Sequence, residues 1–483
     1  MSQNIKSITN PALKLTILSK SDIQSIHTAT LDIIESVGVR FPSEKALQLW
    51  ESFGAEVDRQ TSIVKIPGNI IENALNLAPS AYTLSARNPY QDLPLDGNHV
   101  FVGTDGCGVE VLDIYNGQRR TSNLQDVADI ARVADTLEEV AFHWVAVSAQ
   151  DKPPATRGLH ELLAVWENST KHVQTESIYN EREARAAIEM AAAIAGGKAE
   201  LREHPVLSMM QCTASPLGHD GGSLDAALLA AEAGLPVGFM TMASCLTTGP
   251  ATMAGNLVVG NAEVISATAL LQLAFPGAPV FYAAAQTASD LRTGAYTGGG
   301  PEDFLFGAAT NILADFYNIP LSMGSFATGA KNPDWQAGIE NSLSTFMASL
   351  VMSDMLLGVG LLHGSRIWSY EQMLLDCEIF SIIHKVMQGI EVNDDTLALD
   401  VIRSVGPEGN FLAQKHTLKH MRDIFLPKFF DRRSYSSWEE KRDGASDWAH
   451  EKAQQILQSH QPEPLDPSLS AELHRLIAKV EKG

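Results

Sequence analysis

Residues 206–245, with the sequence VLSMMQCTASPLGHDGGSLDAALLAAEAGLPVGFMTMASC, hold two short apolar runs on either side of a helical pattern. The runs occupy residues 206–215 and 237–245, and each has the length of a buried strand. A strand, a helix and another strand in succession are typical of a parallel sheet. This stretch therefore predicts one unit of an α/β fold.

The same alternation continues on both sides of this unit. Six further apolar runs predict strands at residues 99–106, 140–149, 171–177, 280–289, 321–329 and 355–364, and helical patterns such as residues 123–137 and 180–197 follow them. Eight strand–helix units in roughly 290 residues fit the (βα)8 TIM barrel, which typically has about 250 residues. We therefore expect a (βα)8 barrel at residues 99–390.

A doubly wound open sheet is the alternative to the barrel. That fold would place a glycine-rich phosphate loop directly between the first strand and a helix. Here the glycine-rich residues 103–108 are followed by VEVLDIYNGQRR at 109–120, which resembles a hairpin insertion and not the start of a helix. The sequence thus gives only weak support to a nucleotide-binding sheet, and the order of the strands is the test.

Two segments flank the expected barrel. Residues 1–98 predict a helical N-terminal cap, because residues 19–39 have apolar positions at helical spacing and residues 42–55 open on Pro-Ser and close at a glycine. Residues 391–483 predict a C-terminal helical segment that is more polar, with helices at 437–460 and 467–483 that face solvent or a partner.

The composition excludes several classes of partner. The 483 residues include 57 acidic and 35 basic ones, and the net charge of −22 opposes binding to nucleic acid or to anionic lipid. The apolar stretch 348–364 is interrupted by Asp354 and by glycines, which favours a buried helix and strand over a membrane span. The N-terminus has no pattern of a secretory signal, so we expect a cytoplasmic protein.

Cysteine use agrees with a reducing compartment. The four cysteines, Cys107, Cys212, Cys245 and Cys377, form neither a CxxC pair nor a zinc-like spacing, so we interpret them as reduced thiols. The sequence does not exclude zinc ligands that come together only in the folded chain. We expect no tightly bound metal or organic cofactor.

In a barrel of this kind the functional side chains follow the carboxyl ends of the strands. The candidates at these ends are Asp105, His143, Trp144, Glu176, Gln211, Ser215, Thr247, Tyr282, Gln286, Phe326, Lys331, His363 and Arg366. Side chains alternate along a strand, so only some of them face the lumen. No Ser-His-Asp order, HExxH motif or phosphate loop is present, and the catalytic residues stay unassigned.

Each candidate also has a structural explanation. His143 suits a hydrogen-bonded core position, and Asp105 suits the turn between two glycines. Glu176 ends an apolar strand, where burial is costly unless the carboxylate binds something, and a surface turn is the alternative.

Residues 324–340, GSFATGAKNPDWQAGIE, combine aromatic side chains with a lysine among glycines. Phe326 and Trp335 suit a soft cation, and Lys331 suits an anion, so a zwitterion would satisfy all three. The following observation points the same way: residues 291–303 place Arg292 and Tyr296 beside three glycines that lead into a helix N-terminus. Ordinary packing in the first stretch and a lid without ligand contact in the second are the alternatives.

Three blocks, residues 250–305, 329–343 and 361–390, resemble the trimethylamine:corrinoid methyltransferase family. The motifs that carry the resemblance are NAE at 261–263, PGAP at 276–279 and PDWQ at 333–336, and the resemblance extends over nearly the whole chain. It implies a barrel that removes a methyl group from an amine and gives it to the cobalt of a corrinoid (cobalamin) on a separate protein.

Two departures refine what the resemblance implies. The archaeal trimethylamine enzymes of the family insert pyrrolysine, whereas this chain has only the standard residues, so it resembles the branch that acts on quaternary amines such as glycine betaine. Where the family often has TD(A/S)K, this chain has TGAK at 328–331, which removes a negative charge near Lys331.

The implied reaction needs few catalytic groups. A quaternary nitrogen that loses a methyl group leaves as a neutral amine, so no general acid is required and positioning can carry much of the catalysis. The expected substrate-binding residues are Phe326, Tyr296, Trp335, Lys331, Arg292, Glu176, Tyr282, Gln286, His363 and Asp105. We also expect a corrinoid protein as partner and a homo-oligomer. The alternative function is a barrel that binds a quaternary amine, or holds the corrinoid protein, without turnover.

Overall fold

The protein is described by a computed structural model that covers residues 5–9, 15–106 and 108–482. Eight parallel strands form its centre: β7 (His99–Thr104), β10 (Val140–Trp144), β11 (His172–Thr175), β12 (Leu207–Cys212), β13 (Val237–Thr241), β15 (Val280–Ala284), β17 (Leu321–Gly324) and β18 (Met355–Val359). β18 pairs with β7, which closes the barrel. The predicted (βα)8 barrel is confirmed, and the open sheet is excluded because it would leave its first and last strands unpaired.

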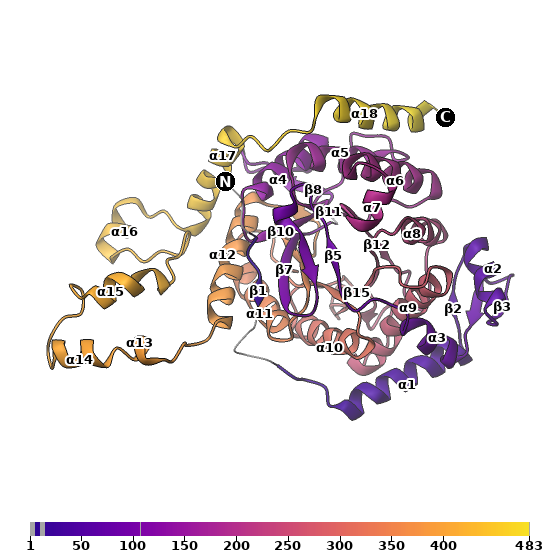
Figure 1. Ribbon diagram of the computed structural model, residues 1–483, viewed down its shortest axis with the longest axis horizontal. Helices are drawn as coiled ribbons and strands as arrows, with labels where there is room; N and C mark the ends of the chain where they lie inside the picture. Colours follow the sequence, from indigo (N-terminus) through magenta and orange to yellow (C-terminus); the bar gives the residue numbers. More distant parts are fainter. Residues whose placement is uncertain (1–4, 10–14, 107, 483) are drawn as a thin grey trace.

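Helices surround the strands (Figure 1). They are α4 (Leu124–Asp135), α5 (Arg157–Asn168), α6 (Glu181–Ala195), α7 (Lys198–Glu203), α8 (Gly221–Ala233), α9 (Met253–Ala274), α10 (Pro301–Tyr317), α11 (Trp335–Leu350) and α12 (Tyr370–Met387). Several begin where a short polar side chain accepts a backbone N–H of the first turn, as Asn180 does in α6 and Ser369 in α12. The helix starts are thus encoded locally.

Glycines leave room for large side chains in the barrel interior. A Cβ on Gly238 of β13 would lie 2.0 Å from the ring of Phe281 on the neighbouring β15. Gly103 and Phe142 make the same kind of contact between β7 and β10. The interior is therefore filled by interlocking side chains up to the mouth, where the strands end.

The N-terminal segment contains the expected helices α1 (Lys20–Ser36), α2 (Glu44–Ser52) and α3 (Gly68–Leu75). It is not wholly helical. β2 (Val39–Arg40), β3 (Glu56–Asp58) and β4 (Ile63–Lys65) form a small sheet, and β5 (Tyr82–Leu84) pairs with β6 (Leu93–Leu95) beside the short helix η1 (Pro89–Gln91). β1 (Ile8–Thr9) pairs with β7. Strands of two or three residues show no alternation in a sequence, so they were not predicted.

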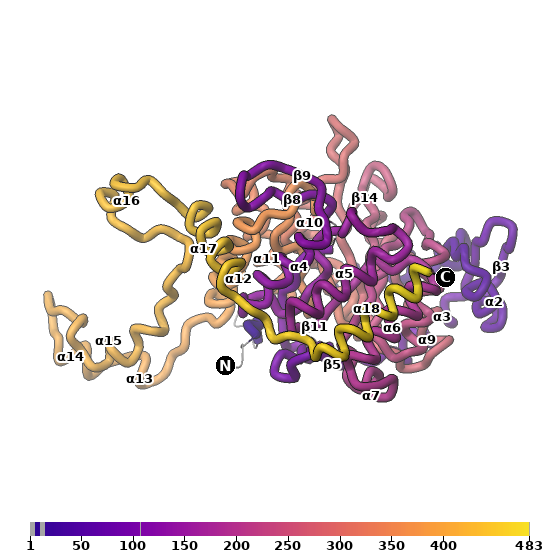
Figure 2. Tube along the Cα trace, turned by 90° about the horizontal axis from the view of Figure 1, so that it is seen from above, coloured from indigo at the N-terminus to yellow at the C-terminus, as the bar shows by residue number. Residues whose placement is uncertain are grey.

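The C-terminal residues form α13 (Asp394–Leu397), α14 (Leu399–Val405), α15 (Lys415–His420), η2 (Met421–Asp423), α16 (Tyr435–Lys441), α17 (Ala445–Ser459) and α18 (Pro467–Lys482). α17 packs on α12, and α18 packs on α6 and α5. The segment between α12 and α17 projects from the side of the barrel (Figures 1 and 2).

Among the described residues, α9 is the one helix long and apolar enough to cross a membrane, and most of it is buried inside the protein. It packs against β13, β15, α1 and α3. This burial is typical of the core helix of a soluble protein.

Candidate functional site at the barrel mouth

A cavity of about 340 Å³ opens at the carboxyl ends of the barrel strands. Residues at or just after the ends of six strands line it, with α10 and the loops before it completing the wall. The lining residues are Asp105, Trp144, Met240, Met242, Ala284, Ala285, Gln286, Tyr296, Asp303, Gly307, Gly324, Ala327, Leu357, Gly358, Gly364 and Ser365. This volume lies near the lower end of ligand pockets, so the cavity suits a small molecule.

Large, polarizable side chains form much of the wall. Trp144 ends β10 and packs against Gly106, where an added Cβ would lie 2.1 Å from the indole. Met240 and Met242 come from β13 and the loop after it. Tyr296 is held in place by its hydroxyl, which donates to the Ala285 carbonyl at 2.9 Å. Such a surface favours a soft cation or a methyl group over a strongly hydrated ligand.

Two carboxyl groups also line the cavity. Asp105 is buried and accepts the Gly106 N–H at 2.7 Å. Asp303 lies in the first turn of α10, where it accepts the Thr287 hydroxyl and the Gly300 N–H. Burial raises the pKa of Asp303 to about 7, against the opposing effect of these hydrogen bonds. The cavity thus carries negative charge that increases through neutral pH.

Glu176 lies beside this acidic region. Its Oε2 is 3.7 Å from the Cys212 sulfur at the end of β12. Burial, Glu176 and Asp105 together raise the pKa of Cys212 well above its usual range, which places both carboxylates near this thiol. Cys212 is therefore a neutral thiol at physiological pH and not an activated nucleophile.

Basic groups gather on another part of the rim. Burial lowers the pKa of His363, and the nearby charges of Lys331, Arg366 and Arg119 lower it further. His363 directly precedes Gly364 and Ser365 in the cavity wall. Two carboxyl groups thus line the cavity, and three cations lie beside it near His363 together with the carboxylate of Glu110.

A hairpin of β8 (Glu110–Leu112) and β9 (Arg119–Thr121) extends the wall above β7. It joins β19 (Leu361–Leu362) and β20 (Ile367–Trp368) in a four-stranded sheet, while β14 (Ser244–Cys245) pairs with β16 (Thr287–Ala288) elsewhere on the mouth. The predicted hairpin insertion after the first barrel strand is confirmed.

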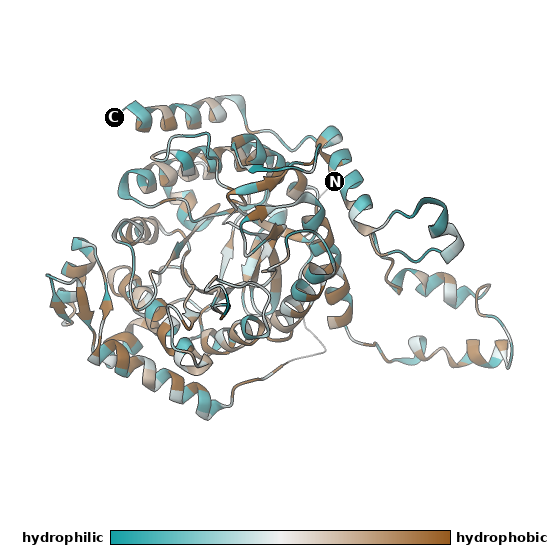
Figure 3. Ribbon diagram, turned by 180° about the vertical axis from the view of Figure 1, so that it is seen from behind, coloured by the Kyte–Doolittle hydropathy of each residue, from teal (hydrophilic) through white to brown (hydrophobic). Residues whose placement is uncertain are grey.

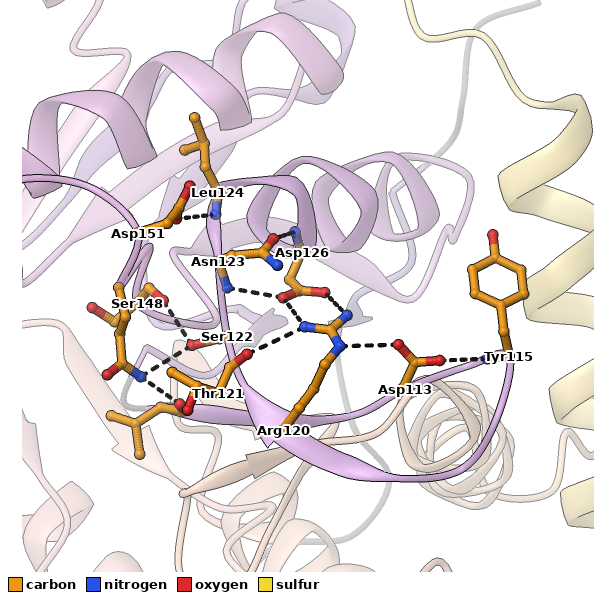
Figure 4. A network of polar contacts seen from close by, with 12 residues as sticks. Asp113, Tyr115, Arg120, Thr121, Ser122, Asn123, Leu124, Asp126, Ser148 and Asp151 are labelled. Carbon is orange, nitrogen blue, oxygen red and sulfur yellow. Dashed lines mark hydrogen bonds and ion pairs between the residues drawn. The ribbon is translucent and has the colours of Figure 1, made fainter.

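Arg120 anchors this hairpin to the barrel (Figure 4). Its guanidinium donates to both oxygens of Asp126 at 2.7 Å and to Asp113 at 2.9 Å. Asp126 is buried in the first turn of α4, where it also caps the helix. One arginine therefore fixes the hairpin to the helix that follows it.

The structure brings three of the expected binding residues together in the cavity, namely Asp105, Gln286 and Tyr296. Gln286 donates from Nε2 to the Asn256 carbonyl at 2.8 Å, and its Oε1 is buried without a partner among the described residues. Glu176 and His363 lie next to the cavity and do not line it.

The other expected binding residues do not line the cavity. Phe326 is fully buried in the core between strands and helices, and Trp335 is 80% exposed at the start of α11, so neither supports the expected cation contact. Tyr282 faces the helix layer, where its hydroxyl donates to Asn261. Lys331 is exposed and donates to the Gly329 carbonyl, and Arg292 is exposed and paired with Asp290.

Sequence reasoning did not select Met240, Met242 or Asp303, and it named Trp144 only as one candidate among many. Methionines on apolar strands give no signal that separates lumen from core. For Asp303 the sequence does contain a signal, because an acidic residue after three glycines marks the start of a helix near the end of a strand. Phe142 and Trp144 of β10 both face the barrel interior. Which of the two alternating sets of side chains faces inward can be seen only once the barrel is closed.

The motif residues Asn261 and Glu263 of α9 are buried and hydrogen-bonded. Glu263 is buried and accepts four hydrogen bonds, from the hydroxyls of Thr213, Ser215 and Thr241 and from the Leu217 N–H. Asn261 bonds to Thr30 and to the hydroxyls of two tyrosines. Glu263 therefore holds the loop after β12 against α9, and Asn261 links α9 to α1, α10 and β15. Neither residue lines the cavity.

One group of described side chains is spaced for a metal ion. Asp395, His416 and His420 lie together in the projecting segment, outside the cavity. His420 is also bonded to Asp423.

Comparison with known proteins gives consistent matches. The model of the trimethylamine methyltransferase (MTTB) family matches residues 1–483. A trimethylamine methyltransferase MttB of Desulfitobacterium hafniense is 36% identical over 466 residues, covering 96% of this chain and 93% of that protein. A glycine betaine methyltransferase of D. hafniense is 34% identical over 472 residues, covering 97% and 98%.

A solved structure supports the fold independently. The monomethylamine methyltransferase MtmB of Methanosarcina barkeri superposes with a TM-score of 0.51 at 13% sequence identity, and the match covers 93% of this chain and 95% of that one. At this identity the likeness concerns the fold alone.

Proposed function

Because the chain belongs to the trimethylamine methyltransferase family, as its motifs predict, we propose that it takes a methyl group from a small quaternary amine, with glycine betaine as the first choice. The acceptor is a reduced corrinoid carried by a separate protein. We further propose that the enzyme works in the cytoplasm and itself holds no tightly bound metal or organic cofactor.

The observation that carries the substrate choice is the charge arrangement around a small cavity. Asp105, Asp303 and the face of Trp144 are suited to a trimethylammonium group inside it. The basic rim at Lys331 and Arg366 is suited to a carboxylate that points outward. A zwitterion such as glycine betaine satisfies both, whereas trimethylamine would use only the inner part.

The side chains of this site bind and orient; they transfer no proton. A reduced corrinoid on the partner protein would supply the electron pair for the new bond to the methyl carbon, and the nitrogen would keep the pair of the bond that breaks. The amine therefore leaves neutral, and no general acid is needed. The positive charge on nitrogen decreases in the transition state, so a tight ion pair would stabilise the bound substrate more than the transition state. A partly protonated Asp303 and a wall of polarizable groups avoid this penalty.

The experiment incubates the purified chain with chemically reduced cobalamin and a panel of amines, and follows methylcobalamin by absorbance. We expect methylation with glycine betaine, slower reaction with choline, which lacks the carboxylate, and little with trimethylamine. Trp144→Leu should weaken glycine betaine binding by about ten- to thirtyfold, because a desolvated cation–π contact contributes on the order of 2 kcal/mol.

Trp335→Leu is the matched control, since this tryptophan is exposed and outside the cavity. It should leave glycine betaine turnover unchanged. Methylation with trimethylamine alone would overturn the choice of substrate. Binding of a quaternary amine without any methylcobalamin would support the non-catalytic alternative.

A further inference from the structure

Residues 390–444, between α12 and α17, form the segment that projects from the side of the barrel (Figures 1 and 2). The structure describes all of them, and Phe429 is the only buried residue among them. Hydrophobic residues on this projecting segment are not covered by the rest of the chain (Figure 3). Its fold therefore does not come from a hydrophobic core of its own.

The helices of the projecting segment are too short to be stable alone. α13, α14, α15 and α16 have four, seven, six and seven residues, and isolated helices shorter than about 12 residues are marginal in water. Folded units without a sufficient core usually contain a disulfide or a structural metal ion, or associate with another chain. The segment has no cysteine, so a disulfide is excluded. A metal ion is the remaining support that a single chain can hold by itself.

Three potential metal ligands come together in the projecting segment. Asp395 lies in α13, and His416 and His420 lie four residues apart on one face of α15. One ligand atom from each of the three lies within 4.8 Å of the other two. The centroids of the two imidazole rings are 4.4 Å apart. Among the described residues, this is the one group of three or more histidine, cysteine or acidic side chains with such spacing.

Distances within this cluster are close to those between zinc ligands. His420 Nε2 lies 3.1 Å from Asp395 Oδ2, and His416 Nε2 lies 3.1 Å from the main-chain carbonyl oxygen of Asp395. Ligand atoms about 2.0–2.2 Å from a tetrahedral Zn²⁺ are themselves about 3.3 Å apart. His420 and Asp395 therefore need only small movements to bind one ion, and His416 is near enough to supply the third ligand.

The surroundings of the cluster also suit a cation. The other ring nitrogen of His420, Nδ1, lies 2.7 Å from Asp423 Oδ2. A carboxylate in this position holds the imidazole proton on Nδ1 and leaves the lone pair of Nε2 for a metal ion. The ammonium of Lys419 is bonded to Asp395 Oδ2, so a positive charge already occupies this position. The Lys419 side chain is 61% exposed, so it can move into solvent when an ion displaces it.

We infer that Asp395, His416 and His420 form a binding site for a divalent transition metal ion, with Zn²⁺ as the first choice and water as the fourth ligand. Imidazole ligands favour Zn²⁺ over Mg²⁺ and Ca²⁺, which prefer oxygen ligands. The ion joins α13 to α15 and so stabilises the projecting segment.

This ion differs from a tightly bound cofactor. With three protein ligands at a partly exposed surface, it exchanges with the solution. The three ligands also lie outside the cavity at the barrel mouth, so the ion takes no part in the proposed methyl transfer. The inference does not rest on that reaction.

The test treats the purified full chain with a chelator, removes the chelator and titrates the chain with Zn²⁺ by calorimetry. We expect one equivalent of Zn²⁺ to bind with a micromolar dissociation constant, and an excess of Mg²⁺ not to compete. Co²⁺ in place of Zn²⁺ should show the visible absorption typical of tetrahedral nitrogen and oxygen ligands.

Two variants test the assigned ligands. His416→Ala/His420→Ala should weaken Zn²⁺ binding at least a hundredfold. Both rings are partly exposed, so far-UV circular dichroism should show an unchanged fold. Asp423→Asn should weaken binding about tenfold, because a carboxylate behind a ligating histidine typically contributes 10- to 100-fold in metal affinity.

His474→Ala is the matched control, because His474 is 60% exposed on α18 and lies beside a single carboxylate, that of Glu167. It should leave Zn²⁺ binding unchanged. As a second measurement, Zn²⁺ should slow amide exchange in residues 394–420 at least tenfold in the parent chain and not in His416→Ala/His420→Ala. Three results would overturn the inference: no Zn²⁺ binding in the parent chain, binding that survives the double variant, or binding without slower exchange.

Discussion

Two aromatic residues near the barrel mouth, Trp144 and Phe326, have opposite environments. Trp144 belongs to the interior cluster and lines the cavity, whereas Phe326 packs between strands and helices. Both follow apolar strands, so the sequence pattern treats them alike. The structure therefore places Trp144 in the wall of the cavity and Phe326 in the packed core.

For Phe326→Ala we predict a loss of stability and not a specific loss of binding. Removing this fully buried ring should lower the free energy of unfolding by about 3–5 kcal/mol, measured by urea denaturation. Phe326→Leu should lose much less. If Phe326→Ala unfolded like the parent chain but bound glycine betaine tenfold more weakly, the ring would have to reach the ligand after all.

Asp303 predicts a pH dependence of ligand binding. A quaternary ammonium keeps its charge at every pH, while Asp303, with a pKa of about 7, gains negative charge as the pH rises from 6 to 8. The dissociation constant of glycine betaine should therefore fall over this interval, as measured by calorimetry. Asp303→Asn should remove the dependence and bind about as weakly as the parent chain does at pH 6.

Asp290 provides the control for this measurement. It lies on the loop before α10, and hydrogen bonds with Arg292 and Thr293 lower its pKa to about 2, so it does not titrate between pH 6 and 8. Asp290→Asn should keep the pH dependence of the parent chain. A flat profile in the parent chain itself would show that Asp303 does not face the bound cation.

At the scale of elements, Arg120 ties the β8–β9 hairpin to α4, in addition to the pairing of β8 with β20. Arg120→Ala should release the hairpin, because Asp126 then loses its bidentate partner while remaining buried. We expect amide exchange of residues 110–121 to accelerate at least tenfold, which corresponds to about 1.4 kcal/mol. Arg120→Lys should give an intermediate effect, since lysine cannot bond to both oxygens in the same geometry.

The neighbouring Arg119 is a natural comparison. It is more exposed, and its single ion pair with Glu110 spans 3.6 Å. Arg119→Ala should therefore leave exchange in the hairpin nearly unchanged. Equal acceleration in the two alanine variants would mean that strand pairing, and not the Arg120 network, holds the hairpin.

At the scale of the whole molecule, the net charge of −22 predicts a salt dependence of stability. Added salt screens the repulsion among the excess carboxylates, so the melting temperature should rise by a few degrees between 20 and 200 mM sodium chloride. At pH 5, close to the isoelectric point of about 5.0, the rise should disappear. An equal rise at both pH values would point to a specific ion effect and not to screening.

The sequence by itself determined the barrel, the hairpin after its first strand and the family. All three depend on local information: the length and spacing of apolar runs, the residues that start helices, and short motifs such as NAE. Tertiary structure decided which side chains form the site. Alternation along a strand gives a period but not its phase, so Trp144 and Tyr282 could be assigned to lumen or helix layer only once the barrel was closed. It also decided that Phe326 is buried and that the segment between α12 and α17 is largely exposed. Burial depends on what packs against a residue, and no single segment contains that information.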